Sequence, residues 1–402
     1  MKILYAVESV NLSGGYDRII IEKANYLAEH GHDVIISVSS HALAQPYYPI
    51  SDKVRVVDFG INFHSQYGHN LLYRAWVYFS LMQRYKKALK KLLFSERPDI
   101  VITTLGREID FITDIHDGST KIGESHIAKD FVRNLHLMEQ RGVVYRMIAR
   151  FWRKKLDKKV RKLDALVLLT QHDADSWQGL TKTVVIPNSL PFYPQQASTC
   201  DNKQVIFVGR FNEQKGLEYL IETWVKVHHL HNDWTLHMYG EGEQESMLRQ
   251  LIQKASLEKV VIVHRPTKLI MEKYLESSIF LLTSRFEGLP MVLIEAMSCG
   301  LPIVSFDCPW GPADVIRNGE DGFLVDYLNT DEAAQRVCQL IENPILRKKM
   351  GTQARKNIQR YDRDVVMKKW TDLFGELVIM PSRKVSVPYE NERSGSMSYL
   401  SL

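Results

Sequence analysis

The sequence is poor in cysteine, and the spacing of the few cysteines excludes two classes of small stabilised protein. Its 402 residues hold four, with no C-x-x-C pair and no histidine at zinc-like spacing: Cys200, Cys299, Cys308 and Cys338. Neither a disulfide framework nor a cysteine-based metal site is therefore predicted. This usage fits a reducing compartment, so we expect a cytoplasmic protein.

Long apolar runs are also missing. None approaches the roughly 18 residues that a membrane-spanning helix needs. The first 15 residues, MKILYAVESVNLSGG, combine one lysine and a short apolar run with Glu8 and a glycine turn. That order is typical of the first strand of a domain rather than of a targeting segment.

The net charge of +5 is small, but the basic residues are concentrated in residues 84–91 (RYKKALKK) and 146–162 (RMIARFWRKKLDKKVRK). The second segment carries apolar residues at helical spacing, which predicts a helix that packs an apolar stripe on a sheet; they are Ile148, Trp152, Leu156, Val160 and Leu163. Its basic face could rest on anionic membrane headgroups, so a peripheral position at the inner face of the membrane is a second expectation. Nucleic acid is not expected as a partner, because no aromatic platform or known module accompanies the charge.

Strand-like and helix-like segments alternate along the chain, which predicts an α/β protein with parallel sheets. The length favours two domains, and the proline-containing polar stretch 191–203 has the composition of a linker. Before it, the strands expected are 1–8, 33–39, 99–104, 166–170 and 183–187, with helices at 16–30 and 73–94. After it, the strands expected are 204–209, 234–239, 260–263, 279–283 and 302–306. A ligand cleft is expected between the domains, where strand ends face each other.

Residues 283–300, TSRFEGLPMVLIEAMSCG, predict a strand, a glycine loop and a helix. Pro290 suits the first helical turn, and a helix N-terminus attracts phosphate. Glu287 lies in the loop and Glu295 eight positions later in the helix, where both could accept hydrogen bonds from sugar hydroxyls. The alternative interpretation is a solvated loop glutamate and a glutamate on the exposed face of the helix.

Two other loops follow strands of the same domain. Arg210 and Lys215 flank the first one and could bind phosphate, the arginine through its fork and the lysine as a point charge. Gly240 and Gly242 lie in the second, where glycine would allow a ligand to approach the backbone. Taken alone, the first pair is more often part of an ordinary surface turn, and the second loop, which is not a complete G-x-G-x-x-G, is a weak signal.

Together, these segments resemble retaining glycosyltransferases of family 4. The resemblance is specific over residues 205–325, through VGRFNEQKGLEYLI, MYGEGEQESMLRQLI and the segment that contains both glutamates. In the first domain it rests on short motifs: Gly14-Gly15, Gly31-His32-Asp33-Val34, Glu124-Ser125-His126 and Val185-Ile186-Pro187-Asn188. The resemblance implies the GT-B fold, with two Rossmann-like domains and an interdomain cleft. Residues 1–193 would then bind the acceptor, 203–361 the donor, and helix 362–378 would cross back to the first domain before a flexible tail at 379–402.

The resemblance also implies roles for individual residues. His126 and Glu287 would act at the reacting sugar, Arg210 and Lys215 would bind the donor diphosphate, and Glu295 would bind the ribose. The other residues implied in donor binding are Gly14, Gly15, Gly240, Gly242, Gly288, Leu289 and Met291, the last three through backbone N–H groups. After strand 260–263, where many members have a glycine, this chain has His264-Arg265-Pro266. Arg265 is therefore a further candidate for donor binding, and the base stays open.

The implied reaction is the transfer, with retention, of a hexosyl or N-acetylhexosaminyl group from a UDP- or GDP-linked sugar. The acceptor would be a glycan or a lipid-linked sugar in cell-surface polysaccharide biosynthesis. Neither a metal nor a cofactor is expected: the two D-x-D sequences, at Asp173 and Asp362, lie where helices begin, which favours N-capping. A glycoside hydrolase, which also uses two carboxylates, would not need the phosphate-binding residues. A nucleotide-sugar epimerase and a non-catalytic nucleotide-sugar binding protein stay open as alternatives.

Overall fold

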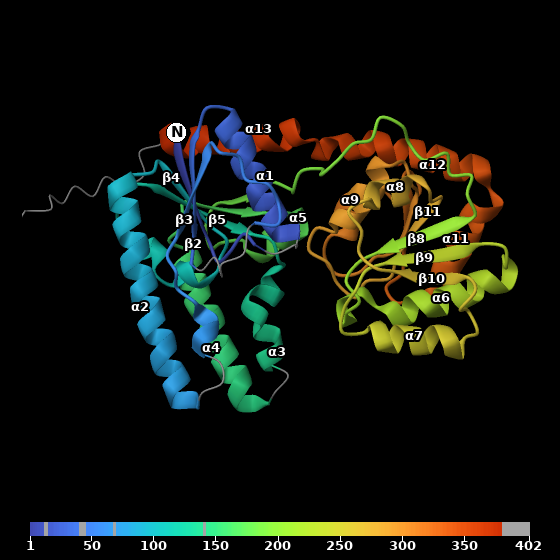
Figure 1. The fold of residues 1–402 in the computed structure, drawn as a ribbon, viewed down its shortest axis with the longest axis horizontal. Coiled ribbons are helices and arrows are strands. Elements are labelled where there is room, and N and C mark those ends of the chain that lie inside the picture. Colours follow the sequence, from blue (N-terminus) through green and yellow to red (C-terminus); the bar gives the residue numbers. More distant parts are fainter. Residues whose placement is uncertain (12–14, 40–45, 67–69, 140–141, 380–402) are drawn as a thin grey trace, which may run out of the picture.

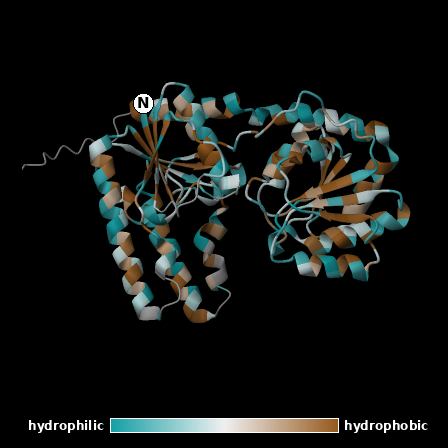
Figure 2. Ribbon diagram, viewed as in Figure 1, coloured by the Kyte–Doolittle hydropathy of each residue, from teal (hydrophilic) through white to brown (hydrophobic). Residues whose placement is uncertain are grey.

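A computed structural model of the chain describes residues 1–11, 15–39, 46–66, 70–139 and 142–379. It consists of two α/β domains that lie side by side, each built on one parallel sheet (Figure 1). In the sequence, the strands of one sheet precede residues 190–203 and the strands of the other follow them; this stretch contains no helix or strand. Hydrophobic residues concentrate in the strands of both sheets (Figure 2). The predicted α/β class with two parallel sheets is therefore confirmed.

The first sheet has seven strands in the order β3-β2-β1-β4-β5-β6-β7. Their bounds are β1 (Lys2–Val7), β2 (Asp33–Val38), β3 (Val54–Asp58), β4 (Ile100–Thr103), β5 (Thr120–Ser125), β6 (Ala165–Leu168) and β7 (Thr183–Val185). Side chains alternate along β1: Ile3 and Tyr5 pack with the core on one face, while Leu4 packs with the core on the other. Both faces are therefore covered by helices, as parallel sheets require.

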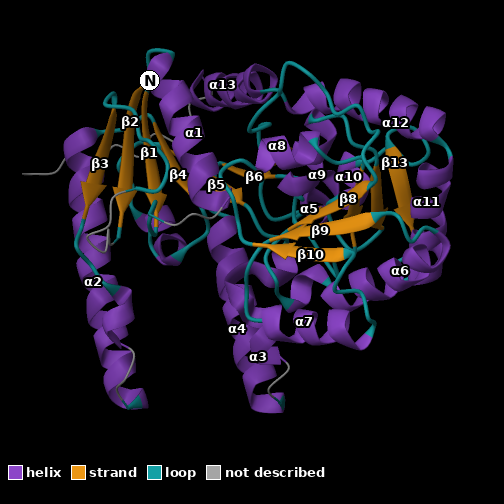
Figure 3. Ribbon diagram, turned by 45° about the vertical axis from the view of Figure 1, so that its right-hand side comes forward, coloured by secondary structure: helices purple, strands orange, loops and turns teal. Residues whose placement is uncertain are grey.

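The helices of this domain differ widely in length. They are α1 (Gly15–Glu29), α2 (Leu71–Glu96), α3 (Leu135–Glu139), α4 (Val143–Val160) and α5 (Gln171–Ser176). The longest, α2, begins at an asparagine cap, because the Asn70 side chain accepts from the Tyr73 N–H at 2.9 Å. Helices α2 and α4 project beyond the sheet in the same direction and lie apart from each other (Figures 1 and 3).

The second sheet has six strands in the order β10-β9-β8-β11-β12-β13. They are β8 (Gln204–Val208), β9 (Thr235–Tyr239), β10 (Val261–His264), β11 (Ile279–Leu282), β12 (Ile303–Phe306) and β13 (Gly322–Val325). The helices around them are α6 (Leu217–Leu230), α7 (Glu245–Lys254), α8 (Ile270–Leu275), α9 (Met291–Ser298), α10 (Pro312–Val315), α11 (Thr330–Glu342) and α12 (Pro344–Asn357). From β8, the chain adds β9 and β10 on one side of the sheet and then β11, β12 and β13 on the other. The switch point of the sheet therefore lies between β8 and β11.

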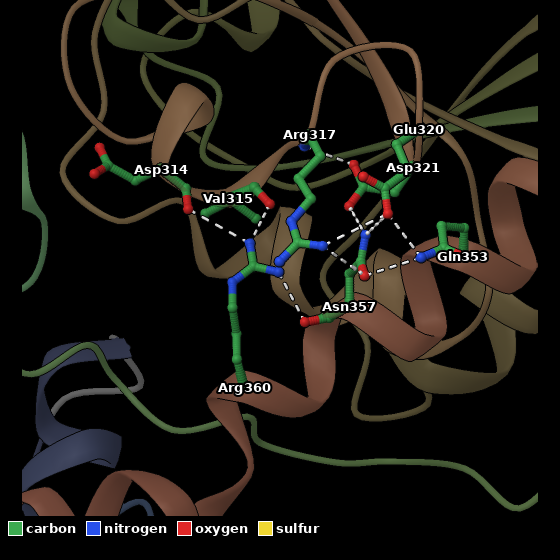
Figure 4. A network of polar contacts seen from close by, with 8 residues as sticks. All are labelled: Asp314, Val315, Arg317, Glu320, Asp321, Gln353, Asn357 and Arg360. Atoms are coloured by element: carbon green, nitrogen blue, oxygen red, sulfur yellow. Dashed lines mark hydrogen bonds and ion pairs between the residues drawn. The ribbon is translucent and has the colours of Figure 1, made fainter.

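The last helix, α13 (Arg363–Ile379), returns to the first domain. Trp370 and Phe374 are buried in the core that α1 and the first sheet share. A polar network holds the preceding turn to the second domain (Figure 4): Asn357 donates to the buried Asp321 at 2.8 Å, and Arg360 donates to the Val315 carbonyl. The crossover therefore starts from a fixed point rather than from a loose linker.

Two expectations about the fold need correction. Strands β3, β5 and β13 were not predicted; β5 (TKIGES) carries mostly polar residues and a glycine, and β3 and β13 are only five and four residues long. The expected apolar stripe of α4 is buried only toward its C-terminal end, at Leu156 and Val160, whereas Ile148 is exposed. The first turns of α4 extend past the sheet (Figure 3), and there Ala149 is buried whereas Ile148 is exposed.

Among the described residues, no helix combines the length and the apolar character that a membrane span requires.

Candidate active site

Three loops of the second domain meet at the carboxyl ends of its central strands. Strands β9, β8 and β11 are neighbours in a parallel sheet, so the loops that follow them share one edge. Backbone hydrogen bonds join the loops: Phe211 N–H donates to the Glu241 carbonyl at 2.8 Å, and Arg285 N–H donates to the Gln214 carbonyl at 2.7 Å. The three loops predicted to bind a donor are therefore in contact.

Close packing of the loops on one another requires glycine at several positions. A Cβ on Gly240 would lie 2.0 Å from the Gly209 carbonyl oxygen, and one on Gly242 would lie 2.3 Å from that of Phe211. Gly216 adopts φ +57°, where its Cβ would lie 2.3 Å from the Thr283 oxygen. Packing accounts for these glycines, and the donor contacts of Gly240 and Gly242 stay predictions.

Lys215 and Glu287 form an ion pair at the centre of the loop cluster. The Lys215 Nζ lies 2.5 Å from Glu287 Oε1, and both side chains are nearly buried. Ser284 Oγ donates to the same oxygen at 2.6 Å, and Gln214 Nε2 lies 3.5 Å from Oε2. Sequence reasoning gave these residues separate ligand groups, whereas the fold places the phosphate-binding and sugar-binding candidates in direct contact. Oε2, the less committed oxygen, is the one that can accept from a ligand.

Helix α9 starts directly after this pair. The backbone N–H groups of Gly288, Leu289 and Met291 donate to no acceptor among the described residues. Met291 is the first residue of α9, where the macrodipole is positive, and Gly288 and Leu289 lie just before the cap residue Pro290. Gly311 packs against the turn that precedes α9. It adopts φ +88°, and a Cβ on this residue would lie 2.4 Å from the Gly288 carbonyl oxygen. Within the described part of the chain, these three N–H groups are therefore unpaired beside the Lys215–Glu287 pair, and their contacts with a donor stay predictions.

Glu295 lies further along α9 and faces the first domain. Its Oε2 accepts from Tyr274 Oη at 3.1 Å, and its Oε1 lies 3.9 Å from Arg18 Nη1 on α1. Burial raises the pKa of Glu295 to about 7, although the nearby Arg18 cation acts in the opposite direction. Glu295 is therefore poised to change protonation near neutral pH.

His126 follows β5 and lies where the first domain meets the second. Its Nε2 lies 3.0 Å from Glu124 Oε1, and the buried Lys23 ammonium contacts that same oxygen. Burial acts to raise the pKa of Glu124, but the Lys23 cation and His126 overcome it and hold this pKa at about 2. A permanent carboxylate thus stands behind the imidazole.

The imidazole of His126 is held by packing rather than by an aligned hydrogen bond. Its Nε2 is not aligned with Glu124 and has no hydrogen-bond partner among the described residues. The Tyr16 ring packs edge-on at 5.0 Å between centroids, and Tyr16 Oη donates to Thr104 Oγ1 at 2.6 Å. The ring is therefore held between Glu124 and Tyr16, and its contact with the sugar stays a prediction.

The two domains touch beside His126. A Cβ on Gly288 would lie 3.3 Å from the His126 carbonyl oxygen, and both residues line a cavity of only about 10 Å³. Next to it, Phe131 stacks on Phe286 at 4.2 Å and meets Trp310 edge-on at 5.3 Å. The fold thus brings the predicted reacting face, His126, against the loop that carries Glu287.

Other predicted residues lie at the rim or outside the described part. Arg210 is 73% exposed, with its guanidinium 3.6 Å from Glu243. Arg265 is equally exposed and lies 3.5 Å from Glu245. Gly15 begins α1, where a Cβ would meet no atom within 4 Å, whereas Gly14 lies outside the described residues.

Sequence reasoning missed Arg18, Lys23 and Ser284. Lys23 occupies a position in α1 where the pattern of buried residues calls for an apolar side chain, and a lysine within such a stripe could have signalled a buried partner. Ser284 lies between the strand and Glu287, so its contact is local. Nothing in the spacing of Arg18 identifies Glu295 as its neighbour.

The D-x-D sequences behave differently from each other. Asp362 caps α13, accepting from the Asp364 N–H at 2.9 Å, as predicted. The prediction for Asp173 was wrong, because Thr170 caps α5, and the buried Asp173 instead accepts from the Lys129 N–H at 3.0 Å. Within the described ranges, no group of three His, Cys, Asp or Glu residues is arranged as metal ligands.

Comparison with known proteins identifies the family. The sequence profile of "Glycosyl transferases group 1" matches residues 193–357. The chain is 30% identical to the amylovoran biosynthesis glycosyltransferase AmsD of Erwinia amylovora, over 92% of this chain and 99% of AmsD. The chain belongs to the group 1 glycosyltransferases. It is also 28% identical to an uncharacterized glycosyltransferase of Haemophilus influenzae, over 92% and 98% of the two chains.

Solved structures agree on the fold of this glycosyltransferase. A TarM variant from S. aureus, in complex with fondaparinux, α-GlcNAc-glycerol and UDP, superposes with a TM-score of 0.73 at 16% identity, covering 93% of this chain and 99% of that one. At this identity the likeness concerns the fold alone. The expected GT-B fold is thereby confirmed.

Proposed function

We propose that this glycosyltransferase is a family 4 enzyme that transfers a hexosyl or N-acetylhexosaminyl group from a UDP- or GDP-linked sugar with retention of configuration. The observation that carries the proposal is the Lys215–Glu287 pair at 2.5 Å, beside the free N–H groups of α9 and opposite His126. A cation, a helix N-terminus and a carboxylate together match a diphosphate joined to a sugar.

Charge development in the reaction fits this arrangement. As the bond between the anomeric carbon and the diphosphate breaks, negative charge grows on the leaving oxygen, and Lys215 with the α9 N-terminus can stabilise it. Arg210, at the rim, can reach a bound diphosphate by a change of side-chain rotamer. With these cations in place, we propose transfer without a metal or a cofactor. The leaving phosphate accepts the proton of the attacking hydroxyl, so no protein nucleophile is required.

The rest of the donor is assigned to residues near this centre. Glu287 Oε2 accepts from hydroxyls of the transferred sugar, and His126 binds the sugar from the other domain. Glu295 binds the ribose, for which its side chain must exchange the contact with Arg18 at 3.9 Å for the ribose hydroxyls. Because the domains touch beside His126, donor entry requires them to separate.

The acceptor is proposed to be a glycan or a lipid-linked sugar in cell-surface polysaccharide assembly. The likeness to AmsD, whose name states amylovoran biosynthesis, supports this setting over 92% of the chain. The UDP in the TarM complex, a protein of the same fold, supports a uridine donor ahead of a guanosine one.

The decisive test is to follow nucleoside diphosphate release from UDP- and GDP-sugars with and without a glycan acceptor, and to determine the anomeric configuration of the product by NMR. We expect release that depends on the acceptor and a product with the anomeric configuration of the donor. Conversion of the donor without any acceptor would indicate the epimerase instead, whereas donor binding without any turnover would indicate a binding protein. An inverted product would refute the retaining assignment.

A further inference from the structure

The two helices that project from the first domain end in large exposed apolar side chains. On α2, Trp76 and Phe79 are each 64% exposed, and on α4, Met147 and Phe151 are 66% and 64% exposed. We call these four residues the apolar tip. Further exposed side chains lie in the first turns of the same two helices: Tyr73, Val143, Val144 and Tyr145. Buried apolar area drives association, so a surface of this kind calls for a partner.

Both helices carry exposed lysines further from their ends. An α-helix turns about 100° per residue, so residues eleven apart lie on nearly the same side, about 16 Å apart. Lys87 follows Trp76 by eleven positions, and Lys158 follows Met147 by the same number. Lys91 and Lys154 lie close to the same two faces. We call the four lysines Lys87, Lys91, Lys154 and Lys158 the basic collar.

The collar is chemically distinct from the other cations of α4. Arg153, Lys155 and Lys159 form ion pairs with Asp130, Asp110 and Asp114 of the same domain. In contrast, no ion pair or hydrogen bond ties the collar side chains to any residue within the described ranges. Their charge is therefore not neutralised by the protein.

We infer that the apolar tip inserts into the surface of an anionic lipid bilayer and that the basic collar lies at the level of its headgroups. Along each helix the apolar tip comes first and the basic collar second. This order matches a bilayer, in which the hydrocarbon would meet the tip and the anionic headgroups would meet the collar. Aromatic residues such as Trp76 favour the boundary between them. Lysine side chains can extend along the helix toward the headgroups, which suits a separation of about 10 Å from Met147 to Lys154.

A second copy of the chain fits this surface less well. A two-fold interface brings the same patch of both copies together, and it would place each uncompensated collar near the other. A bilayer satisfies both features at once, since its hydrocarbon takes the tip and its phosphates take the collar. Docking would also orient the enzyme, because β1, β2 and β3 point toward the end of the domain from which α2 and α4 project (Figure 3). The carboxyl end of the first sheet, where His126 follows β5, would then face the membrane side.

The test is co-sedimentation of the full chain with phosphatidylcholine vesicles that contain increasing amounts of phosphatidylglycerol. Wild-type binding should rise with phosphatidylglycerol and fall with salt, because a screened surface potential attracts the collar less. Lys154→Gln with Lys158→Gln should weaken binding about 25-fold, since each near-surface cation contributes about fivefold. Met147→Ser with Phe151→Ser should weaken it about tenfold or more by removing inserted apolar area.

Matched controls come from the second domain. Leu230→Ser with Ile345→Ser removes two apolar side chains that are 67% and 82% exposed, and Lys349→Gln with Lys356→Gln removes two exposed lysines of α12. Both controls should bind vesicles like wild type. Equal losses in controls and test variants, absence of wild-type binding, or binding that ignores salt would overturn the inference. A dimer that dissociates in the Met147→Ser, Phe151→Ser variant, seen by light scattering without lipid, would assign the surface to a second copy. Vesicle binding needs neither donor nor acceptor, so the result is independent of the proposed function.

Discussion

Substitutions of Lys215 and of Glu287 should have opposite effects on the binding of a nucleoside diphosphate. The Glu287 carboxylate neutralises the Lys215 ammonium at 2.5 Å. Glu287→Gln removes the negative charge and leaves the cation, so binding of free nucleoside diphosphate should be as tight as in wild type or tighter. Lys215→Met removes a charged hydrogen bond to phosphate, worth about 1.5 to 3 kcal/mol, and should weaken that binding about 10- to 100-fold.

Turnover should fall in both variants, but for different reasons. Glu287→Gln loses contacts to the sugar, and kcat should fall about 10- to 100-fold, while Lys215→Met should lose stabilisation of the leaving group. Both side chains are nearly buried, so either single change leaves an unpaired charge and should reduce the free energy of unfolding by up to about 3 kcal/mol. The double variant should lose less than the sum of the two.

The assays are calorimetric titration of UDP and GDP, initial rates, and urea unfolding of the four proteins in this cycle. Gln214→Ala offers a control, since that side chain contacts Glu287 only at 3.5 Å. Weaker diphosphate binding by Glu287→Gln than by Lys215→Met would refute the division into a sugar-binding and a phosphate-binding residue. Additive losses of stability would refute the ion pair.

Four further predictions follow from buried groups. The fold raises the pKa of Glu295 from 4.5 to about 7 and so favours its protonated form. The protein should therefore become less stable as the pH rises from about 5 to 8. Glu295→Gln should remove this dependence of Tm on pH in thermal melts. Donor affinity should change in the other direction, tightening several-fold from pH 6 to 8 in wild type and not in Glu295→Gln, because the carboxylate is the stronger acceptor for ribose hydroxyls. The pKa of Glu124 is lowered to about 2, so its stabilising pair with Lys23 should be complete above about pH 4.5 and lost toward pH 2; Glu124→Gln should unfold more easily at pH 7 by about 3 kcal/mol, and equal stability of the two proteins would contradict the buried pair. Trp370→Ala should cost about 3 to 5 kcal/mol of unfolding free energy, because α13 buries this ring in the first domain, and a loss below 1 kcal/mol would mean that the crossover helix is not docked.

The loop cluster of the second domain was within reach of the sequence, whereas its complete strand order was not, because β13 was missed. Loops after parallel strands must meet at one edge, so Lys215 and Glu287 could be assigned to the same site from their positions after β8 and β11. Their direct pairing could not be predicted, because it depends on how closely the glycine-rich loops pack. The short strands β3 and β13 carry too little apolar pattern to be found.

Contacts between distant segments were out of reach. Lys23 and Glu124 are 101 residues apart, and no periodicity links a lysine of α1 to a carboxylate of β5. Likewise, the stripe of α4 predicts which side chains share a face, but not whether another element covers that face. Ile148 is exposed because α4 is longer than the sheet that it packs on (Figure 3). The apolar tip is therefore a finding of the structure alone.

The most direct test of the donor site is a thermal-shift screen of UDP- and GDP-sugars on wild type and Lys215→Met. A ligand at 100 times its Kd stabilises the fold by about 2.7 kcal/mol, which should raise Tm by several degrees. We predict that at least one nucleotide sugar produces this shift in wild type and little or none in Lys215→Met at the same concentration. The absence of any shift in wild type, or an equal shift in both proteins, would contradict the assignment of the Lys215–Glu287 centre as a nucleotide-sugar site.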